Sequence, residues 1–296
     1  MIDEYIETFI NYLEYERHYS LFTVDSYSND LKIFINFLNV EGINKIKDID
    51  YKIIRNYLSY LHNNNYAKTS ISRNISSLRS LFKYLLRENI ITSNPMTLIS
   101  NPKQDKRLPH FLYYKELEEL LSIPDDDASG IRDSLILELL YSTGIRVSEL
   151  VNIKTKDINT HNKTIKILGK GSKERYVLYG SVCEEKMNHY LNKSRPELVK
   201  APNDYLLLNK YGNKLTTRGI RYIIDTIIKK GALKFHISPH DLRHTFATHI
   251  LNEGADLKTV QELLGHENLS TTEVYTHVSN EKLRSVYLNC HPRAKK

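Results

Sequence analysis

The stretch ISPHDLRHTFATHIL, residues 237–251, carries a clear helix signal. Ser238 is a strong N-cap residue, and Asp241 completes a capping-box pair with it. His240 and Arg243 then lie three residues apart in the first turns, on one face of the helix. A helix N-terminus attracts anions through its free N–H groups and its dipole. The stretch therefore predicts a helix that presents a histidine and an arginine to a phosphate group.

A second arginine is predicted at a helix start by the stretch STGIRVSEL, residues 142–150. Arg146 follows Gly144 closely, and Glu149 stands three residues later, where its carboxylate could orient the guanidinium. An arginine of this kind is most often one half of a surface ion pair. The pattern by itself leaves both interpretations open.

The one clear β-strand pattern is TIKILGKGSKERYVLYG, residues 164–180. Two short runs rich in Ile, Val, Leu and Tyr flank a glycine-containing turn, which predicts a hairpin. Lys170 falls in this turn, from which it could reach a bound backbone and protonate a leaving oxygen. Taken alone, the residue is better explained as a solvent-exposed turn lysine. Residues 205–208 are a possible third strand, and the rest of the second half predicts helices.

A tyrosine follows in the stretch LLGHENLSTTEVYTH, residues 263–277. Gly265 fits the left-handed position that ends a helix, and His266 projects from that corner. Ser270 opens a further capping box, so Tyr275 is predicted on a short, separately capped helix.

A phenol has a pKa near 10, so Tyr275 attacks a phosphodiester only where positive charge and hydrogen bonds support it. Two arginines, two histidines and a lysine around one phosphate would neutralise the developing charge and transfer protons without a metal. The residues that could do so are Arg146, Lys170, His240, Arg243 and His266.

Two other interpretations use the same residues. The segment HDLRH, residues 240–244, spaces two histidines like a metal site, but Arg243 stands between them and no third ligand follows at a suitable spacing. A DNA-binding regulator without chemistry would explain the basic charge. It would leave Tyr275, His266 and Lys170 without a role.

The first 90 residues or so predict four helices, the second capped by Thr23, the third at Tyr51–Leu61 and the fourth opened by Thr69. A segment with three prolines and a basic run then predicts a linker. The expected divisions are a helical domain at 1–88, a linker at 89–110, a mixed α+β domain at 111–286 and a tail at 287–296. The fold class is mainly α with a small β-sheet.

Charge and composition favour a nucleic-acid partner. The chain of 296 residues carries a net charge of +7, distributed as −5 over residues 1–40, +7 over residues 41–110 and +5 over the rest. Clustered positive charge of this kind favours a polyanion, although on charge alone solvated surface lysines would explain it equally well. The residues predicted to contact DNA are Arg73, Arg79, Lys83, Lys173 and Arg175.

The composition also indicates a compartment. No apolar run approaches the ~20 residues that cross a bilayer, and the acidic N-terminus is unlike a secretory signal. Cys183 and Cys290 stand far apart, which argues against a disulfide framework. We therefore expect a cytoplasmic protein without a membrane partner.

Taken together, the motifs resemble those of the tyrosine site-specific recombinases, and within them the Xer proteins. The resemblance covers essentially the whole chain, and the ending NCHPRAKK resembles one of the two chromosomal Xer paralogues more than the other. The matching stretches are TGIRVSELVNI, LGKGSKER, HDLRHTFATHILNEGADLKTVQELLGH and NLSTTEVYTHVS.

The resemblance implies a role for each of six residues. Arg146 and Arg243 would grip the scissile phosphate while Tyr275 attacks it to form a 3′-phosphotyrosyl bond. Lys170 would protonate the departing 5′-hydroxyl. His240 would be the acid/base partner of the tyrosine, and His266 would hydrogen-bond the phosphate. The ester keeps the bond energy, so the resemblance implies neither ATP nor a metal.

The resemblance also implies an assembly. A helical core-binding domain and a tyrosine-recombinase catalytic domain would clamp double-stranded DNA at a dif-like site. Two protomers each of two paralogous Xer recombinases would exchange strands and convert chromosome dimers to monomers at cell division. The tail would dock on a neighbouring protomer, and a DNA translocase of the division site would be the regulator. The alternatives are an integrase or resolvase of a mobile element, or a non-catalytic DNA-binding regulator.

Overall fold

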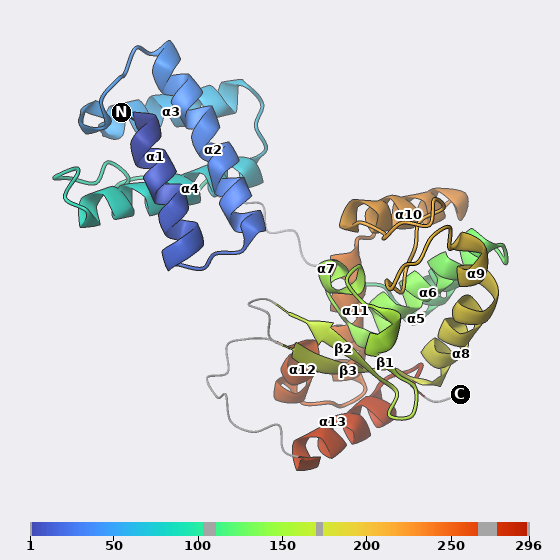
Figure 1. The fold of residues 1–296 in the computed structure, drawn as a ribbon. Helices are drawn as coiled ribbons and strands as arrows, with labels where there is room; N and C mark the ends of the chain where they lie inside the picture. Colours follow the sequence, from blue (N-terminus) through green and yellow to red (C-terminus); the bar gives the residue numbers. More distant parts are fainter. Residues whose placement is uncertain (1, 103–110, 170–173, 266–276, 295–296) are drawn as a thin grey trace. The chain divides into compact units, whose positions relative to one another are not determined.

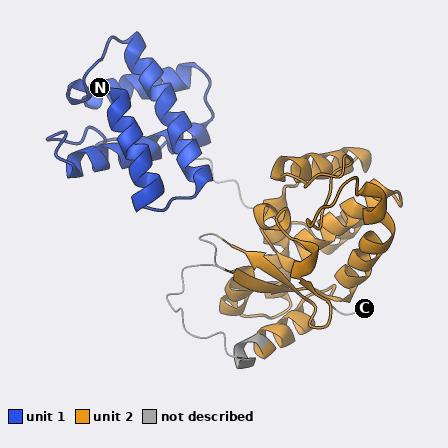
Figure 2. Ribbon diagram, viewed as in Figure 1, with its two compact units in different colours: residues 1–107 blue, residues 108–296 orange. Residues whose placement is uncertain are grey.

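The computed structural model describes residues 2–102, 111–169, 174–265 and 277–294, with side chains of the last segment from residue 281 on. The chain forms two compact units, Met1–Arg107 and Leu108–Lys296 (Figure 2). The predicted fold class is confirmed, because helices dominate both units and a small sheet occurs in the second (Figure 1).

Unit 1 packs its helices around an aromatic core that contains Phe9, Phe34 and Phe82. The N-cap of the second helix is Ser20, whose hydroxyl accepts the backbone N–H of Thr23. The predicted Thr23 cap is therefore wrong, because Thr23 lies inside the first turn. The helices are α1 (Ile2–Asn11), the π-helix η1 (Tyr12–Glu16), α2 (Leu21–Val40), the 3-10 helix η2 (Ile46–Asp48), α3 (Tyr51–Asn63) and α4 (Lys68–Arg87).

The segment after α4 packs on unit 1. Ile91, Met96 and Ile99 are buried in its core. Residues 91–99, which the sequence assigned to a linker, therefore contribute to the packing of the first unit.

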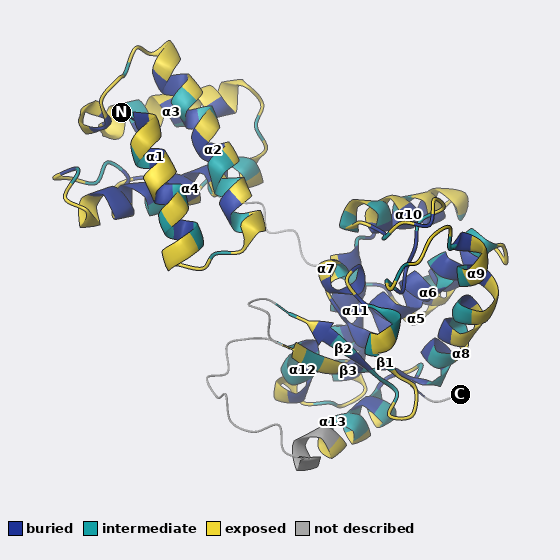
Figure 3. Ribbon diagram, viewed as in Figure 1, coloured by how far each residue is buried: buried dark blue, intermediate teal, exposed yellow. Residues whose placement is uncertain are grey.

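Unit 2 is built around α6, which is buried along most of its length (Figure 3). Leu135, Ile136 and Leu137 are consecutive and all buried, which is typical of a helix enclosed on every side. The helices of this unit are α5 (Tyr114–Ser122), α6 (Ala128–Thr143), α7 (Val147–Leu150), the 3-10 helix η3 (Thr155–Asp157), α8 (Ser181–His189), the π-helix η5 (Tyr190–Ser194), α9 (Arg195–Leu198), α10 (Thr217–Lys230), α11 (Pro239–Asn252), α12 (Leu257–Leu264) and α13 (His277–Cys290).

The described part of unit 2 contains one antiparallel sheet of three strands in the order β1-β2-β3. The predicted hairpin is confirmed as β2 (Thr164–Leu168) and β3 (Glu174–Leu178). The third strand is β1 (Ile158–Asn159), so the strand predicted at 205–208 is wrong. Leu206, Leu207 and Leu208 are all buried instead of alternating, and this segment forms only isolated bridges.

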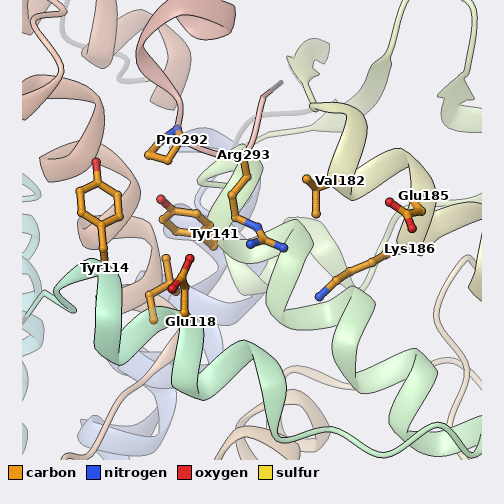
Figure 4. A pocket seen from close by; sticks show the side chains of 9 residues that line it. Tyr114, Glu118, Tyr141, Val182, Glu185, Lys186, Pro292 and Arg293 are labelled. Atoms are coloured by element: carbon orange, nitrogen blue, oxygen red, sulfur yellow. The ribbon is translucent and has the colours of Figure 1, made fainter. Parts of the chain in front are cut away.

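The C-terminal residues pack on their own unit. The guanidinium of Arg293 hydrogen-bonds the buried carboxylate of Glu138, and the backbone N–H of Ser181 donates to the Ala294 carbonyl. Pro292 and Arg293 line a cavity of about 330 Å³ together with Tyr141 (Figure 4). This contact lies within one chain, so docking of the tail on a neighbouring protomer stays a prediction.

Across the described ranges, none of the helices combines the length and the apolar character that crossing a bilayer requires.

Candidate active site

The first component of the site is Arg243 on α11. The predicted capping box is confirmed, because Ser238 and Asp241 satisfy each other's backbone N–H groups. Arg243 is buried, and its guanidinium donates to the backbone carbonyls of Gly144 and, at 2.8 Å, of Leu264. Arg243 therefore links the C-terminal ends of α6 and α12 to the N-terminal part of α11 through hydrogen bonds.

Arg146 is the second component, and the turn before it explains its position. Gly144 adopts a left-handed conformation with φ of 59°, which ends α6 and redirects the chain into α7. A Cβ at Gly144 would also lie 2.6 Å from the Phe246 ring. The Glu149 carboxylate accepts the backbone N–H of Arg146 at 2.7 Å and its Nη1 at 3.0 Å, as the spacing predicted. The Arg146 side chain keeps 43% of its surface exposed.

A third guanidinium, that of Arg175 on β3, lies in the same cluster. It forms a bidentate ion pair with Glu149, with Nη1–Oε1 at 2.8 Å and Nη2–Oε2 at 3.0 Å. Arg175 is only 14% exposed and Glu149 only 5%. The sequence predicted that Arg175 contacts DNA, whereas its two Nη atoms are bound to a carboxylate within the protein.

The pKa shifts of Arg243 and Glu149 indicate that the charged groups of this cluster interact with one another. Burial, together with the positive charges of Arg146 and Arg175, lowers the pKa of Arg243 to about 10, against the opposing effect of Glu149. Burial would raise the pKa of Glu149, but hydrogen bonds from Arg175 and from the Arg146 backbone, with both positive charges, lower it overall. Three guanidiniums and one carboxylate leave a net positive charge, which is suited to an anion.

The remaining predicted residues fall at the edges of this cluster or outside the described ranges. His240 is exposed in the first turn of α11. Gly265 ends α12 with a φ of 67°, as predicted, and a Cβ there would lie 2.6 Å from Nε of Arg175. The turn end of the hairpin, on β3, and the end of α12 therefore meet at Arg175, and Figure 1 shows these two elements side by side. Lys170, Lys173, His266 and Tyr275 lie outside the described residues.

In unit 1, the three residues predicted to contact DNA differ in their surroundings. Arg73 binds the buried carboxylate of Asp30 through Nε and Nη2 at 3.0 and 2.7 Å, while half of its surface stays exposed. Arg79 donates to the Ile99 carbonyl and to Asn101. Lys83 is exposed on α4. Arg73 and Lys83 are therefore accessible to a partner, whereas the Arg79 guanidinium holds the segment after α4.

The role of Glu149 as a shared partner of two arginines was not predicted. A signal for it exists in β3, where Arg175 and the buried Val177 are two residues apart and so share one face of the sheet. An arginine on a core-facing position needs a partner for its charge. Glu149 is that partner, 26 residues earlier in the chain.

Comparisons with known proteins identify the family of this chain. Residues 110–282 match the phage integrase family, and residues 6–89 match the N-terminal SAM-like domain of phage integrases. Tyrosine recombinase XerC of Staphylococcus epidermidis is 48% identical over 296 residues, covering 100% of this chain and 99% of the relative. Tyrosine recombinase XerC of Staphylococcus aureus is 51% identical over 293 residues, covering 98% of this chain and 97% of the relative.

Solved structures show the same architecture. The XerH site-specific recombinase bound to a palindromic difH substrate, in a post-cleavage complex, aligns with a TM-score of 0.70 at 29% identity, covering 92% of this chain and 81% of that chain. A λ integrase dimer bound to a COC′ core site aligns with a TM-score of 0.70 at 19% identity, over 92% of this chain and 98% of that one, which shows a common fold. The paralogue that the ending NCHPRAKK resembles is XerC, the name that both staphylococcal relatives carry. The chain belongs to the tyrosine site-specific DNA recombinases of the phage integrase family, in the Xer group, and is similar to XerC.

Proposed function

We propose that this recombinase cleaves DNA by attack of Tyr275 on a phosphodiester that Arg146 and Arg243 hold. The supporting observation is the cluster of guanidiniums at the start of α7 and α11, where the charges of Arg146 and Arg243 affect each other. A phosphate between them would gain charge-assisted hydrogen bonds that strengthen as the pentacoordinate transition state gains charge. The product is a 3′-phosphotyrosyl ester and a free 5′-hydroxyl, and the reverse attack restores the DNA strand.

The other assignments follow the motifs. Lys170 protonates the leaving 5′-oxygen, His240 exchanges a proton with the tyrosine, and His266 donates to a phosphate oxygen. The exposure of His240 in the first turn of α11 is compatible with this role. The reaction so described consumes neither ATP nor a metal, because the ester conserves the bond energy.

We further propose the biological setting of a chromosomal XerC. The chain would act at a dif-like site in a heterotetramer with a XerD-like partner, convert chromosome dimers to monomers in the cytoplasm at cell division, and respond to a DNA translocase at the division site. The identity of 48–51% to two XerC proteins over nearly the whole chain supports this setting. We propose that residues 1–88 form a clamp domain to whose packing residues 91–99 add, that the rest of 89–110 is a linker, that 111–286 form the catalytic domain and that 287–296 form a docking tail.

Covalent trapping tests the chemistry. The protein is incubated, with and without a candidate partner recombinase, on a nicked duplex that carries the dif-like site. A denaturing gel should show a protein–DNA adduct without added metal, and Tyr275→Phe should abolish the adduct while DNA binding persists. Specific binding without an adduct under every condition would refute the proposed chemistry and favour a regulator. Full activity without a second recombinase would instead favour an integrase or resolvase of a mobile element.

A further inference from the structure

We infer that Arg175 is a positioning residue, which occupies the Glu149 carboxylate and thereby leaves Arg146 available to the scissile phosphate. The inference rests on the proposed function and adds a residue to it. It replaces the expectation that Arg175 contacts DNA.

The acceptor sites of Glu149 show how the sharing works. Its Oε1 accepts Nη1 of Arg146 at 3.0 Å and Nη1 of Arg175 at 2.8 Å. Its Oε2 accepts the backbone N–H of Arg146 at 2.7 Å and Nη2 of Arg175 at 3.0 Å. A carboxylate has about four lone-pair positions, so these four hydrogen bonds fill it. Among the described residues, Arg146 is thus held by a single side-chain bond, which leaves most of its five N–H donors for another anion.

The charges lead to the same result. Glu149 is nearly buried, where a carboxylate interacts strongly with any adjacent cation. With Arg175 bound in a bidentate pair, the negative charge of Glu149 is compensated by a residue other than Arg146. Without Arg175, Glu149 would draw Arg146 into a bidentate pair of its own. A phosphate would then have to displace that carboxylate before Arg146 could bind it.

The location of Arg175 explains why a strand residue has this task. The Arg175 side chain lies next to Gly265, because a Cβ at Gly265 would come within 2.6 Å of the Arg175 Nε. The same guanidinium donates to Glu149 on α7. No hydrogen-bond partner for this Nε occurs within the described ranges. The guanidinium therefore connects β3, α7 and the end of α12, which are the described flanks of the site. A direct DNA contact would require it to leave Glu149 buried without its bidentate partner.

The experiment is a double-mutant cycle on single-turnover cleavage of the nicked dif-like duplex by the full-length protein. Arg175→Ala should reduce the cleavage rate about 100-fold, comparable to the loss of one transition-state donor. Glu149→Gln should have a smaller effect, since an amide oxygen still accepts a bond from Arg146. Arg175→Ala combined with Glu149→Gln should recover to within about fivefold of Glu149→Gln alone, because the competing charge is gone.

Two other roles predict different results. A direct DNA contact predicts no rescue by Glu149→Gln, and a purely structural role predicts a rate loss that follows thermal stability. Arg132→Ala is the matched control, because Arg132 is another buried arginine paired with a carboxylate, that of Asp133. It should lose stability without a comparable loss of cleavage. If Arg175→Ala does not fold, Arg175→Gln takes its place in the cycle with the same expectations. Additive effects of the two substitutions would overturn the inference.

A binding cycle separates this inference from the proposed chemistry. The salt dependence of DNA affinity is measured with Tyr275→Phe as the parent. In an Arg146→Ala background, Arg175→Ala should leave the slope of log K against log salt unchanged, whereas a direct phosphate contact would reduce it by about one. If the wild-type protein forms no adduct, the proposed chemistry fails, and the binding cycle still decides the role of Arg175.

Discussion

Replacing Arg243 by lysine should damage both the fold and the chemistry, whereas replacing Arg146 by lysine should damage the chemistry alone. Arg243 is buried and bridges the carbonyls of Gly144 and Leu264, which end two different helices. Lysine keeps the charge, but its ammonium is a point donor that cannot span both carbonyls and also reach a phosphate. Arg146 is 43% exposed, and within the part of the chain that the structure describes its side chain makes one bond, to Glu149.

The expected magnitudes follow from these contacts. A buried acceptor that loses its partner costs ~1–3 kcal/mol, so Arg243→Lys should lower the free energy of unfolding by about 2 kcal/mol. For a domain of this size that loss corresponds to a decrease in Tm of about 4–8 °C. Arg146→Lys should cost less than about 1 kcal/mol, as is usual for an exposed ion pair. Both variants should lose about 100-fold or more in single-turnover cleavage, the usual effect of removing a transition-state donor.

Thermal unfolding and cleavage of the nicked duplex are measured on the same preparations. DNA binding should change far less than cleavage in both variants, and also in Arg146→Ala and Arg243→Ala, because many other basic residues contact phosphates. Equal changes in Tm for the two lysine variants would refute the assignment of Arg243 as a structural bridge. Equal losses in binding and cleavage would refute the assignment of both arginines to the scissile phosphate.

Three further outcomes are expected. Gly265→Ala should lower both Tm and the cleavage rate, because the Gly265 φ is 67° and the new Cβ would lie 2.6 Å from the Arg175 Nε. An unchanged cleavage rate in a gel-based assay would contradict that close approach. Asp30→Asn should lower the Tm of unit 1, because it removes the negative charge that pairs with Arg73. An unchanged Tm of an isolated 1–107 fragment would show that this ion pair does not stabilise the unit. Burial lowers the pKa of His291 to about 3, against about 6.5 in an unfolded chain, so the unfolded state binds the proton first and stability falls as the pH falls below about 6.5. Urea unfolding at pH 7 and pH 5 should differ by about 2 kcal/mol from this group, and His291→Phe should reduce the difference.

Local signals in the sequence predicted local structure well. The capping box at Ser238, the left-handed Gly265 and the hairpin over 164–180 each depend on residues within a few positions of one another, and all three are confirmed. The N-cap at Ser20 was missed because Ser20 and Thr23 are both good caps, and only the backbone conformation separates them. The strand predicted at 205–208 failed because an apolar run does not distinguish a strand from a buried loop.

Contacts between residues far apart in the sequence could not be predicted from composition and spacing. Arg73 finds Asp30 across 43 positions, and Arg175 finds Glu149 across 26. Each arginine was predicted to contact DNA because basic residues on a chain of this charge favour a polyanion. Both are bound to a buried carboxylate, and Arg73 alone keeps half of its surface exposed. A count of basic residues therefore overestimates the charge that is available to DNA.

The partners of the three guanidiniums also explain why Arg146 and Arg243, rather than Arg175, are suited to bind the phosphate. Of the three guanidiniums in the cluster, Arg175 is the one that a described carboxylate binds in a bidentate pair. Arg243 is held by carbonyl oxygens, which orient it without cancelling its charge. The Arg146 side chain donates one bond to a carboxylate that Arg175 already occupies. Counting the described residues, the cluster thus keeps a net charge of two positive units, and the proposed mechanism assigns its two arginines without a bidentate carboxylate, Arg146 and Arg243, to the scissile phosphate. The negative charge of a dianionic transition state would interact directly with these two guanidiniums and be stabilised by them.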